Sequence, residues 1–138
     1  MRSLAEVESE VRRLAQALEA ANHDLPSWGA SGGAARPHVE VDDEGYHFVV
    51  VDRGREQLRD TTTDFDELLY WIFSDATHRL AFAYEAAHRV DGQDVRRLAF
   101  ARQIELLDRV APPMATRRRA EIARILETAP YRDRAARA

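Results

Sequence analysis

Apolar positions near the N-terminus recur every three or four residues, with charged residues between them. The apolar stripe consists of Leu4, Val7, Val11, Leu14 and Leu18. This spacing predicts an amphipathic helix within residues 1–22 that packs on a core by one face. Because the stripe also spans about two heptads, a coiled coil is the alternative, in which the chain is a weak homodimer with a structural or regulatory role instead of a monomer.

The helical pattern ends in a stretch rich in Gly, Ser and Pro, residues 23–37, which predicts a loop. Trp28 lies within this loop. A large aromatic side chain in a loop either packs on the core or contacts a partner, because exposed aromatic surface favours association.

Polar and apolar residues begin to alternate at His38, and this pattern predicts a β-hairpin over residues 38–53. Asp42-Asp43-Glu44-Gly45 supplies its turn. Apolar residues then lie opposite each other on the face toward the core. The predicted pairs are Val39 with Phe48 and Val41 with Tyr46 on that face, and Glu40 with His47 on the outward face. A third, more polar strand over residues 55–62 completes an antiparallel sheet, since no helical crossover separates the strands.

The remaining pattern is helical. Thr63-Asp64-Phe65-Asp66-Glu67 offers side-chain oxygens and acidic groups to a helix N-terminus, and this helix is expected to run to about residue 90. A second helix is predicted over residues 94–110 and is stopped by Pro112-Pro113. A third helix is predicted to end before Pro130, and the tail after it is expected to be frayed.

These elements predict an α+β fold with an N-terminal helix, a small antiparallel β-hairpin or three-stranded sheet, and then a bundle of three helices over residues 64–129. A chain of 138 residues has the length of one domain, so residues 1–138 are interpreted as a single domain.

Charged residues interrupt the apolar lines of two predicted helices. Asp75 lies in the first of them, and Arg96 and Arg97 lie in the second. Either each side chain extends out of the helix seam into water, or the two helices fold back and Asp75 pairs with Arg96 or Arg97. The pairing would have a structural role, because a charge left unpaired in the seam is costly.

The amino-acid composition of the chain limits the kinds of chemistry and the location that can be expected for it. All 20 basic residues are arginine, which indicates a GC-rich genome more simply than a guanidinium-specific role such as phosphate binding. The chain has no cysteine, so disulfides and thiolate chemistry are excluded. It has no signal-peptide pattern and no long apolar run, so a cytoplasmic protein without membrane contact is expected.

Charge is unevenly distributed in a chain whose net charge is −4. Residues 40–75 hold 11 acidic residues and three arginines, whereas residues 117–137 hold seven arginines and three acidic residues. One part of the molecule is therefore expected to present negative potential and another part positive potential. Arg117-Arg118-Arg119 is interpreted as solvated helix surface and not as a nucleic-acid contact, because the chain is acidic overall.

Candidate catalytic chemistry is sparse. His38, Glu40 and His47 are a ligand set suited to iron or zinc, so a small metal-dependent enzyme is one alternative. In the predicted register, however, they are ordinary outward-facing residues. No serine lies in a G-x-S-x-G turn, and Gly32-Gly33 is not a phosphate-binding loop. We therefore expect no metal, no cofactor and no catalytic residue.

Four motifs together are similar to those of one known family. They are GYHFVVVDRG at residues 45–54, DELLYWIFSDAT at 66–77, GQDVRRLAF at 92–100 and PYRD at 130–133. With these motifs the chain resembles the immunity protein 63 family of bacterial polymorphic-toxin systems. The resemblance implies a non-enzymatic cytoplasmic antitoxin that binds a cognate toxin domain and occludes the active site of that toxin.

Given this implied partner, the acidic segment is a candidate binding surface, because clustered carboxylates can steer a basic toxin toward them. Aromatic side chains beside them would anchor the contact. The candidate toxin-binding residues are Trp28, Asp42, Asp43, Glu44, Tyr46, Asp60, Asp64, Asp66 and Glu67. For most of the acids the alternative is that they only cap a turn and a helix N-terminus.

Overall fold

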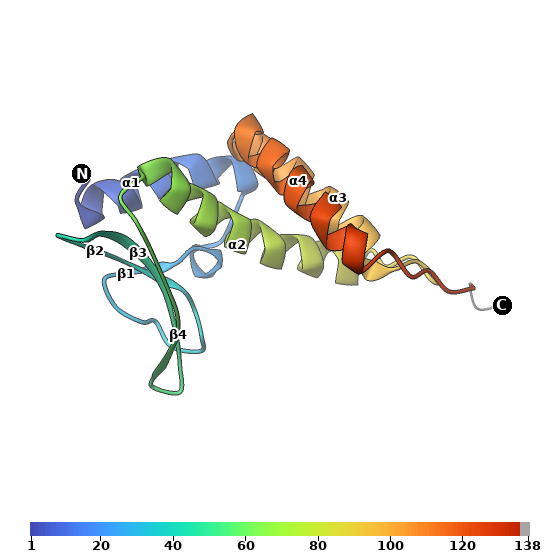
Figure 1. Cartoon of the computed structure of the whole chain (residues 1–138), viewed down its shortest axis with the longest axis horizontal. Coiled ribbons are helices and arrows are strands. Elements are labelled where there is room, and N and C mark those ends of the chain that lie inside the picture. Colours follow the sequence, from blue (N-terminus) through green and yellow to red (C-terminus); the bar gives the residue numbers. More distant parts are fainter. Residues whose placement is uncertain (136–138) are drawn as a thin grey trace. The chain divides into compact units, whose positions relative to one another are not determined.

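A computed structural model describes residues 1–135 (Figure 1). Within these residues the fold is α+β, with an N-terminal helix, a four-stranded mixed sheet and then three helices, which confirms the predicted fold class. The chain forms two compact units, Met1–Phe73 and Ser74–Ala138, and the division falls within a long helix. Its interpretation as one domain stays a prediction.

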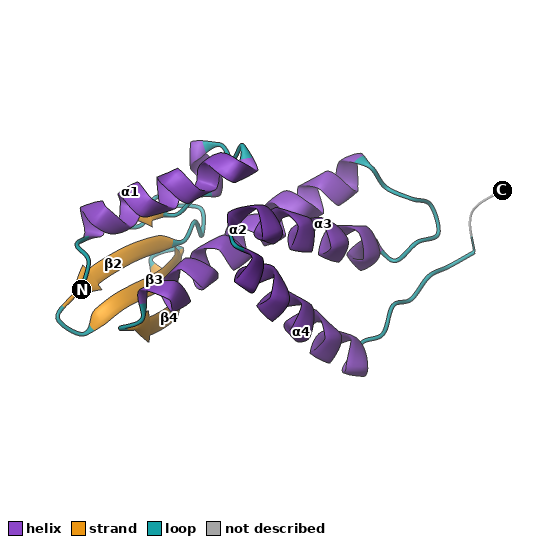
Figure 2. Ribbon diagram, turned by 90° about the horizontal axis from the view of Figure 1, so that it is seen from above, coloured by secondary structure: helices purple, strands orange, loops and turns teal. Residues whose placement is uncertain are grey.

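The first unit begins with the predicted amphipathic helix. Ser3 caps it, because the Ser3 hydroxyl accepts from the N–H of Glu6 while the Glu6 carboxylate accepts from the N–H of Ser3. Val7 and Val11 of the apolar stripe are completely buried, and the helix contacts the sheet at β2 (Figure 2). The stripe is thus used by the core of the chain itself, which contradicts a coiled coil along it. The helical elements here are α1 (Leu4–Ala15) and short 3-10 turns at Gln16–Leu18 and Asn22–Asp24.

The sheet has the strand order β1-β2-β3-β4, and Figure 2 shows β2, β3 and β4 side by side. The predicted hairpin register is confirmed, because Val39 pairs with Phe48, Val41 with Tyr46 and Glu40 with His47. The predicted third strand also forms, antiparallel to the hairpin. The strands are β1 (Ser27–Trp28), β2 (His38–Asp42), β3 (Gly45–Asp52) and β4 (Arg55–Thr62).

The sequence does not predict β1. Ser27–Trp28 pairs in parallel with His38 and Val39, so the expected loop over residues 23–37 contains a strand and the sheet is mixed. The N–H of Gly29 donates to the carbonyl of Val39 at 2.8 Å and extends this pairing. A strand of two residues is too short to leave a period-two pattern, which is why alternation does not reveal it.

A bulge in β4 determines which side chains share a face of the sheet. Leu58 and Glu56 pair with consecutive residues of β3, so Gln57 is the extra residue between them. The bulge places Glu56 and Arg59 on the same face although they are three residues apart. The Nε of Arg59 donates to the Oε1 of Glu56 at 2.8 Å on this face.

The longest helix, α2 (Phe65–Ala87), begins where the sequence predicts and ends slightly earlier than expected. Leu68, Ile72 and Phe73 on it are completely buried, in agreement with its dense apolar pattern. None of the helices in residues 1–135 combines the length and apolarity that crossing a membrane requires.

The second unit contains the later part of α2 together with α3 and α4, which pack against each other (Figure 1). Asp94 caps α3, since its Oδ1 accepts from the N–H of Arg96 at 2.9 Å. Pro112 and Pro113 form the first turn of α4, where a backbone N–H has no intrahelical acceptor and proline is tolerated. The bounds are α3 (Val95–Val110) and α4 (Pro112–Thr128).

A buried amide joins the helices of the second unit. Gln103 is 1% exposed, and its Nε2 donates to the carbonyl of Ser74 at 3.0 Å. Its Oε1 accepts from the Nε of Arg118 on α4 at 2.9 Å. Because a buried amide without partners would destabilise the fold, these bonds specify how α2, α3 and α4 meet within this unit.

Candidate functional site

One end of the first unit gathers acidic side chains from two separate segments, the β2–β3 turn and the N-terminus of α2. The segments meet because Gly45, just after the turn, lies against the chain just before α2. A Cβ atom on Gly45 would be 2.5 Å from the carbonyl oxygen of Thr62, and the φ of Gly45 is +136°. We call this surface the acidic end, and it consists of Asp42, Asp43, Glu44, Asp64 and Asp66.

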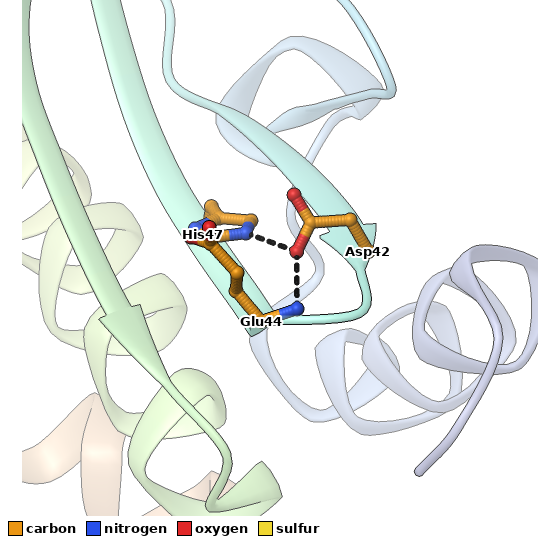
Figure 3. A group of neighbouring side chains, drawn as sticks. All are labelled: Asp42, Glu44 and His47. Atoms are coloured by element: carbon orange, nitrogen blue, oxygen red, sulfur yellow. Dashed lines mark hydrogen bonds and ion pairs between the residues drawn. The ribbon is translucent and has the colours of Figure 1, made fainter.

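Two members of the acidic end are part of the architecture. The Oδ1 of Asp42 accepts from the N–H of Glu44 at 2.9 Å and lies 2.7 Å from the Nε2 of His47 (Figure 3). The hydrogen bond with His47 holds the pKa of Asp42 below its usual range. Asp64 caps α2, since its Oδ1 accepts from the N–H of Asp66 at 2.9 Å.

The other members of the acidic end face solvent. The side chains of Asp43, Glu44 and Asp66 are exposed, and none of them forms a hydrogen bond or ion pair with any of residues 1–135. The structure therefore divides the predicted acidic surface into carboxylates that hold the turn and the helix and carboxylates that are available to a partner.

The remaining acidic candidates lie outside this group. Asp60 is exposed on β4, opposite Phe48 of β3. Glu67 is half-buried in the first turn of α2. They flank the acidic end along the chain but do not belong to the surface that the Gly45 contact assembles.

The two aromatic candidates differ in exposure. Trp28 is half-buried in β1, at an edge of the sheet. Tyr46 is only 2% exposed, and its hydroxyl accepts from the N–H of Arg2 at 2.8 Å. Its ring packs on Phe65 with a centroid distance of 5.7 Å. Tyr46 is thus a core residue and not an accessible anchor, because its place on the apolar face of β3 turns it inward.

The polar face of the hairpin is not open to solvent, contrary to the prediction. His38 and His47 are 3% and 1% exposed. From β4, Arg59 donates to Glu40 on β2 at 3.3 Å, so its long side chain crosses β3 and covers this face. The Nε2 of His38 lies 2.7 Å from the Oε2 of Glu40, and this bond holds the pKa of Glu40 below its usual range.

The predicted metal ligands His38, Glu40 and His47 do not converge. The Nδ1 of His47 lies 2.7 Å from the Oγ1 of Thr61, and its Nε2 is bonded to Asp42. Both ring nitrogens of His47 therefore have partners within the sheet, one on β4 and one on β2, and nothing in this arrangement points to a ligand. Among residues 1–135, the side chains whose ligand atoms do lie within 4.8 Å of one another are Asp42, Glu44 and His47 (Figure 3).

In the second unit, the predicted pairing of Asp75 with Arg96 or Arg97 does not form. The Oδ2 of Asp75 accepts from the Nη2 of Arg79 at 2.9 Å, one turn along the same helix. Arg96 and Arg97 lie in the first turn of α3, where the segment after α4 passes close to them. They bind that segment, which offers carbonyl oxygens and a carboxylate at short range.

This contact between the start of α3 and the C-terminal segment is a dense polar network. The Oδ1 of Asp133 accepts from the N–H of Asp94 at 2.8 Å, and the Oδ2 of Asp94 accepts from the N–H of Arg132 at 2.8 Å. Arg97 bonds the Asp133 carboxylate at 2.9 Å and lies 4.2 Å over the ring of Tyr131. We call the network the C-terminal clasp, and it consists of Gly92, Asp94, Arg96, Arg97, Ala129, Pro130, Tyr131, Arg132, Asp133 and Arg134.

The clasp corrects the expectation of a frayed tail. Residues 129–134 are held by backbone and side-chain hydrogen bonds, and residues 136–138 of the predicted tail lie outside the described residues. The bond from Arg97 holds the pKa of Asp133 below its usual range, and the bond from Arg96 does the same for Asp94. Sequence motifs at 92–97 and 130–133 marked these residues, but no periodicity indicates that they meet.

The arginine run at the start of α4 is partly tied to its own unit. The Nε of Arg118 donates to Gln103, and the Nε of Arg117 lies 3.7 Å from the Oε2 of Glu121. Arg119 is exposed, and its side chain has no hydrogen bond or ion pair with the residues that the structure describes. This distribution fits the interpretation as helix surface.

Comparison with known proteins adds a family to this geometry. The sequence model of the family described as immunity protein 63 matches residues 42–124. The matched segment begins in the acidic end and stops within α4, before the PYRD motif of the clasp. Neither a curated protein nor a solved structure matches the chain.

Proposed function

The chain belongs to the immunity protein 63 family, and on that premise we propose that it neutralises a cognate toxin by binding the toxin domain at the acidic end and occluding the toxin active site. The family match over residues 42–124 is the observation that carries the proposal. Membership by itself implies a toxin partner in general terms. The contact surface and the occlusion are our inference.

The acidic end supports the choice of surface because some of its carboxylates have no other role. Asp43, Glu44 and Asp66 lie on a turn and a helix N-terminus that meet at Gly45, and their side chains form no ion pair within residues 1–135. Unpaired carboxylates at fixed positions attract a basic surface over several ångströms and raise its association rate. A toxin that binds a polyanionic substrate would present such a surface.

Trp28 is the aromatic residue that could anchor the contact. It is half-buried on an edge strand, so the residue is partly exposed to a partner, and the pairing of β1 with β2 fixes its backbone. A pre-positioned tryptophan loses little conformational entropy on binding. On this proposal the antitoxin needs no catalytic group, because a protein that covers an active site inhibits by occupancy alone.

The test uses the toxin domain from the neighbouring gene, because membership in the family implies that the toxin gene lies beside the immunity gene. Co-expression with the chain should rescue growth, and the purified proteins should bind. The variant Asp43→Lys/Glu44→Lys/Asp66→Lys should lower the association rate constant about tenfold or more, and it should flatten the dependence of this constant on salt.

A matched variant separates local charge from net charge. Glu19→Lys/Asp52→Lys/Glu127→Lys changes the net charge equally at exposed positions outside the acidic end, and its association rate should fall much less. Equal rates for wild type and the first variant would remove the acidic end as the contact surface. Absence of binding by the wild-type chain would overturn the antitoxin proposal itself.

A further inference from the structure

The second unit has an unfilled hollow between α3 and α4. Its volume is about 370 Å³, and most of its lining is apolar. Phe100 and Ile122 at its floor are 6% and 8% exposed, so the floor is fixed by the core of the unit. Ala101 and Ile104 line the side formed by α3, and Tyr131 of the clasp closes one end.

Two arginines stand at the margin of this hollow, and they differ in their contacts. Arg97 is bonded to Asp133 of the clasp. Arg119 has no side-chain partner among residues 1–135, although every other arginine of α3 and α4 contacts a carboxylate or a carbonyl oxygen. A cation beside an apolar depression selects a ligand that carries both apolar surface and negative charge.

At one end of the hollow, the C-terminal segment of the chain already contributes both an apolar ring and a carboxylate that binds an arginine. The ring of Tyr131 lies 6.4 Å from the ring of Phe100, and the carboxylate of Asp133 is bonded to Arg97 at 2.9 Å. An aromatic residue followed two positions later by an acid is therefore a combination that this surface binds. The other end, around Ile104, Ile122 and Arg119, offers the same combination of groups and is empty.

We propose that this empty part of the hollow is a second contact surface for the cognate toxin, which inserts a bulky apolar side chain against Ala101, Ile104 and Ile122 and places a neighbouring carboxylate on Arg119. The proposal rests on the proposed function for the identity of the partner. It concerns a surface whose charge is opposite to that of the acidic end, so a basic segment of the toxin does not fit here.

The two surfaces should affect different rate constants. Charges on the acidic end act at long range and influence how fast the partners meet. An apolar side chain in a depression acts only after contact, so its loss mainly accelerates dissociation. Arg119 contributes to both effects, whereas Ala101 contributes only to the second.

The experiment measures binding of the adjacent-gene toxin domain to three single variants. Arg119→Glu reverses the charge at the margin, and Ala101→Trp fills the hollow from an exposed position without changing charge. Arg119→Glu and Ala101→Trp should each weaken affinity about tenfold or more, and Ala101→Trp should do so through dissociation alone. Arg124→Glu, an exposed position on α4 outside the hollow, is the matched control and should bind like wild type.

Thermal unfolding should show that the variants fold, since Arg119 has no side-chain partner to lose in residues 1–135 and Ala101 is exposed. If the wild-type chain binds the toxin and both hollow variants bind equally well, the second surface is overturned while the antitoxin function stands. If Arg124→Glu weakens binding as much as Arg119→Glu, the change in net charge explains the loss of affinity, and the proposal of a second contact surface is again overturned. If the wild-type chain does not bind, the proposed function fails first.

Discussion

The acidic end and the C-terminal clasp both concentrate charged side chains, but they use them in different ways. In the clasp, Asp94 and Asp133 each accept hydrogen bonds from backbone and arginine donors. At the acidic end, Asp43 and Glu44 have no such partners in residues 1–135. Charged side chains that remain unpaired are therefore the ones open to a partner. Paired clusters hold the fold.

The largest expected effect comes from the residue that assembles the acidic end. Gly45→Ala should lower the free energy of unfolding by about 3 kcal/mol, because a Cβ would clash with the Thr62 carbonyl oxygen and the backbone is strained for other residues. Binding to the toxin should weaken as well. Gly54→Ala is the control: its φ is +75° with nothing within 4 Å, so about 1–2 kcal/mol is expected from backbone strain alone. If chemical denaturation gives the same loss in free energy of unfolding for both variants, the contact of Gly45 with Thr62 is unimportant for stability.

The clasp should respond to acid. Since the folded-state pKa of Asp133 is depressed, its carboxylate stabilises the second unit above the ordinary value of about 3.9 and loses this contribution as pH falls through the folded-state pKa. Asp133→Asn should therefore lower the melting temperature by a few degrees at pH 7, and the difference from wild type should shrink as pH falls from about 3.9 through the folded-state pKa. Differential scanning calorimetry across this range measures it, and a difference that persists at low pH contradicts the ionic role of Asp133.

The smallest effects should separate the two kinds of acid within the acidic end. Asp64→Ala removes the cap of α2 and should lower the melting temperature by a few degrees, while its effect on toxin association should be no larger than that of losing one steering charge. Glu44→Gln should leave the melting temperature unchanged and slow association about twofold to threefold, because one steering charge is lost. Stopped-flow binding measures the association rate of each variant, and thermal unfolding measures its melting temperature. Reversed results for the two variants would mean that structural and steering acids have been wrongly assigned.

Local patterns predict most of the first unit. Alternation and an acidic turn were enough for the register of Val39 with Phe48 and of Val41 with Tyr46, since slipping by one residue would turn apolar side chains outward. The same alternation wrongly predicted that His38 and His47 face solvent, whereas both side chains are buried. Alternation identifies two faces of a strand but does not show that Arg59, from a strand further along the chain, reaches across one of them.

Long-range polar contacts could not be predicted in the same way. The pair of Asp75 with Arg79 is local, and the spacing of four residues on one helix could have indicated it. For longer-range pairs the sequence offers many combinations of acids and arginines and does not rank them. The clasp joins residues almost forty positions apart through backbone groups as well as side chains. Such a contact depends on where α3 and α4 end, and helix periodicity does not specify that.

The bulge at Gln57 also has a consequence for how copies of this protein behave toward each other. In the part of the chain that the structure describes, β4 is a sheet edge of eight residues, and open edges of this length invite strand pairing between molecules. The irregular backbone at Gln57, together with the flanking Arg55, Glu56, Arg59 and Asp60, interrupts a regular ladder and adds charges along the edge. The bulge and these charges therefore disfavour edge-to-edge pairing between copies of this protein.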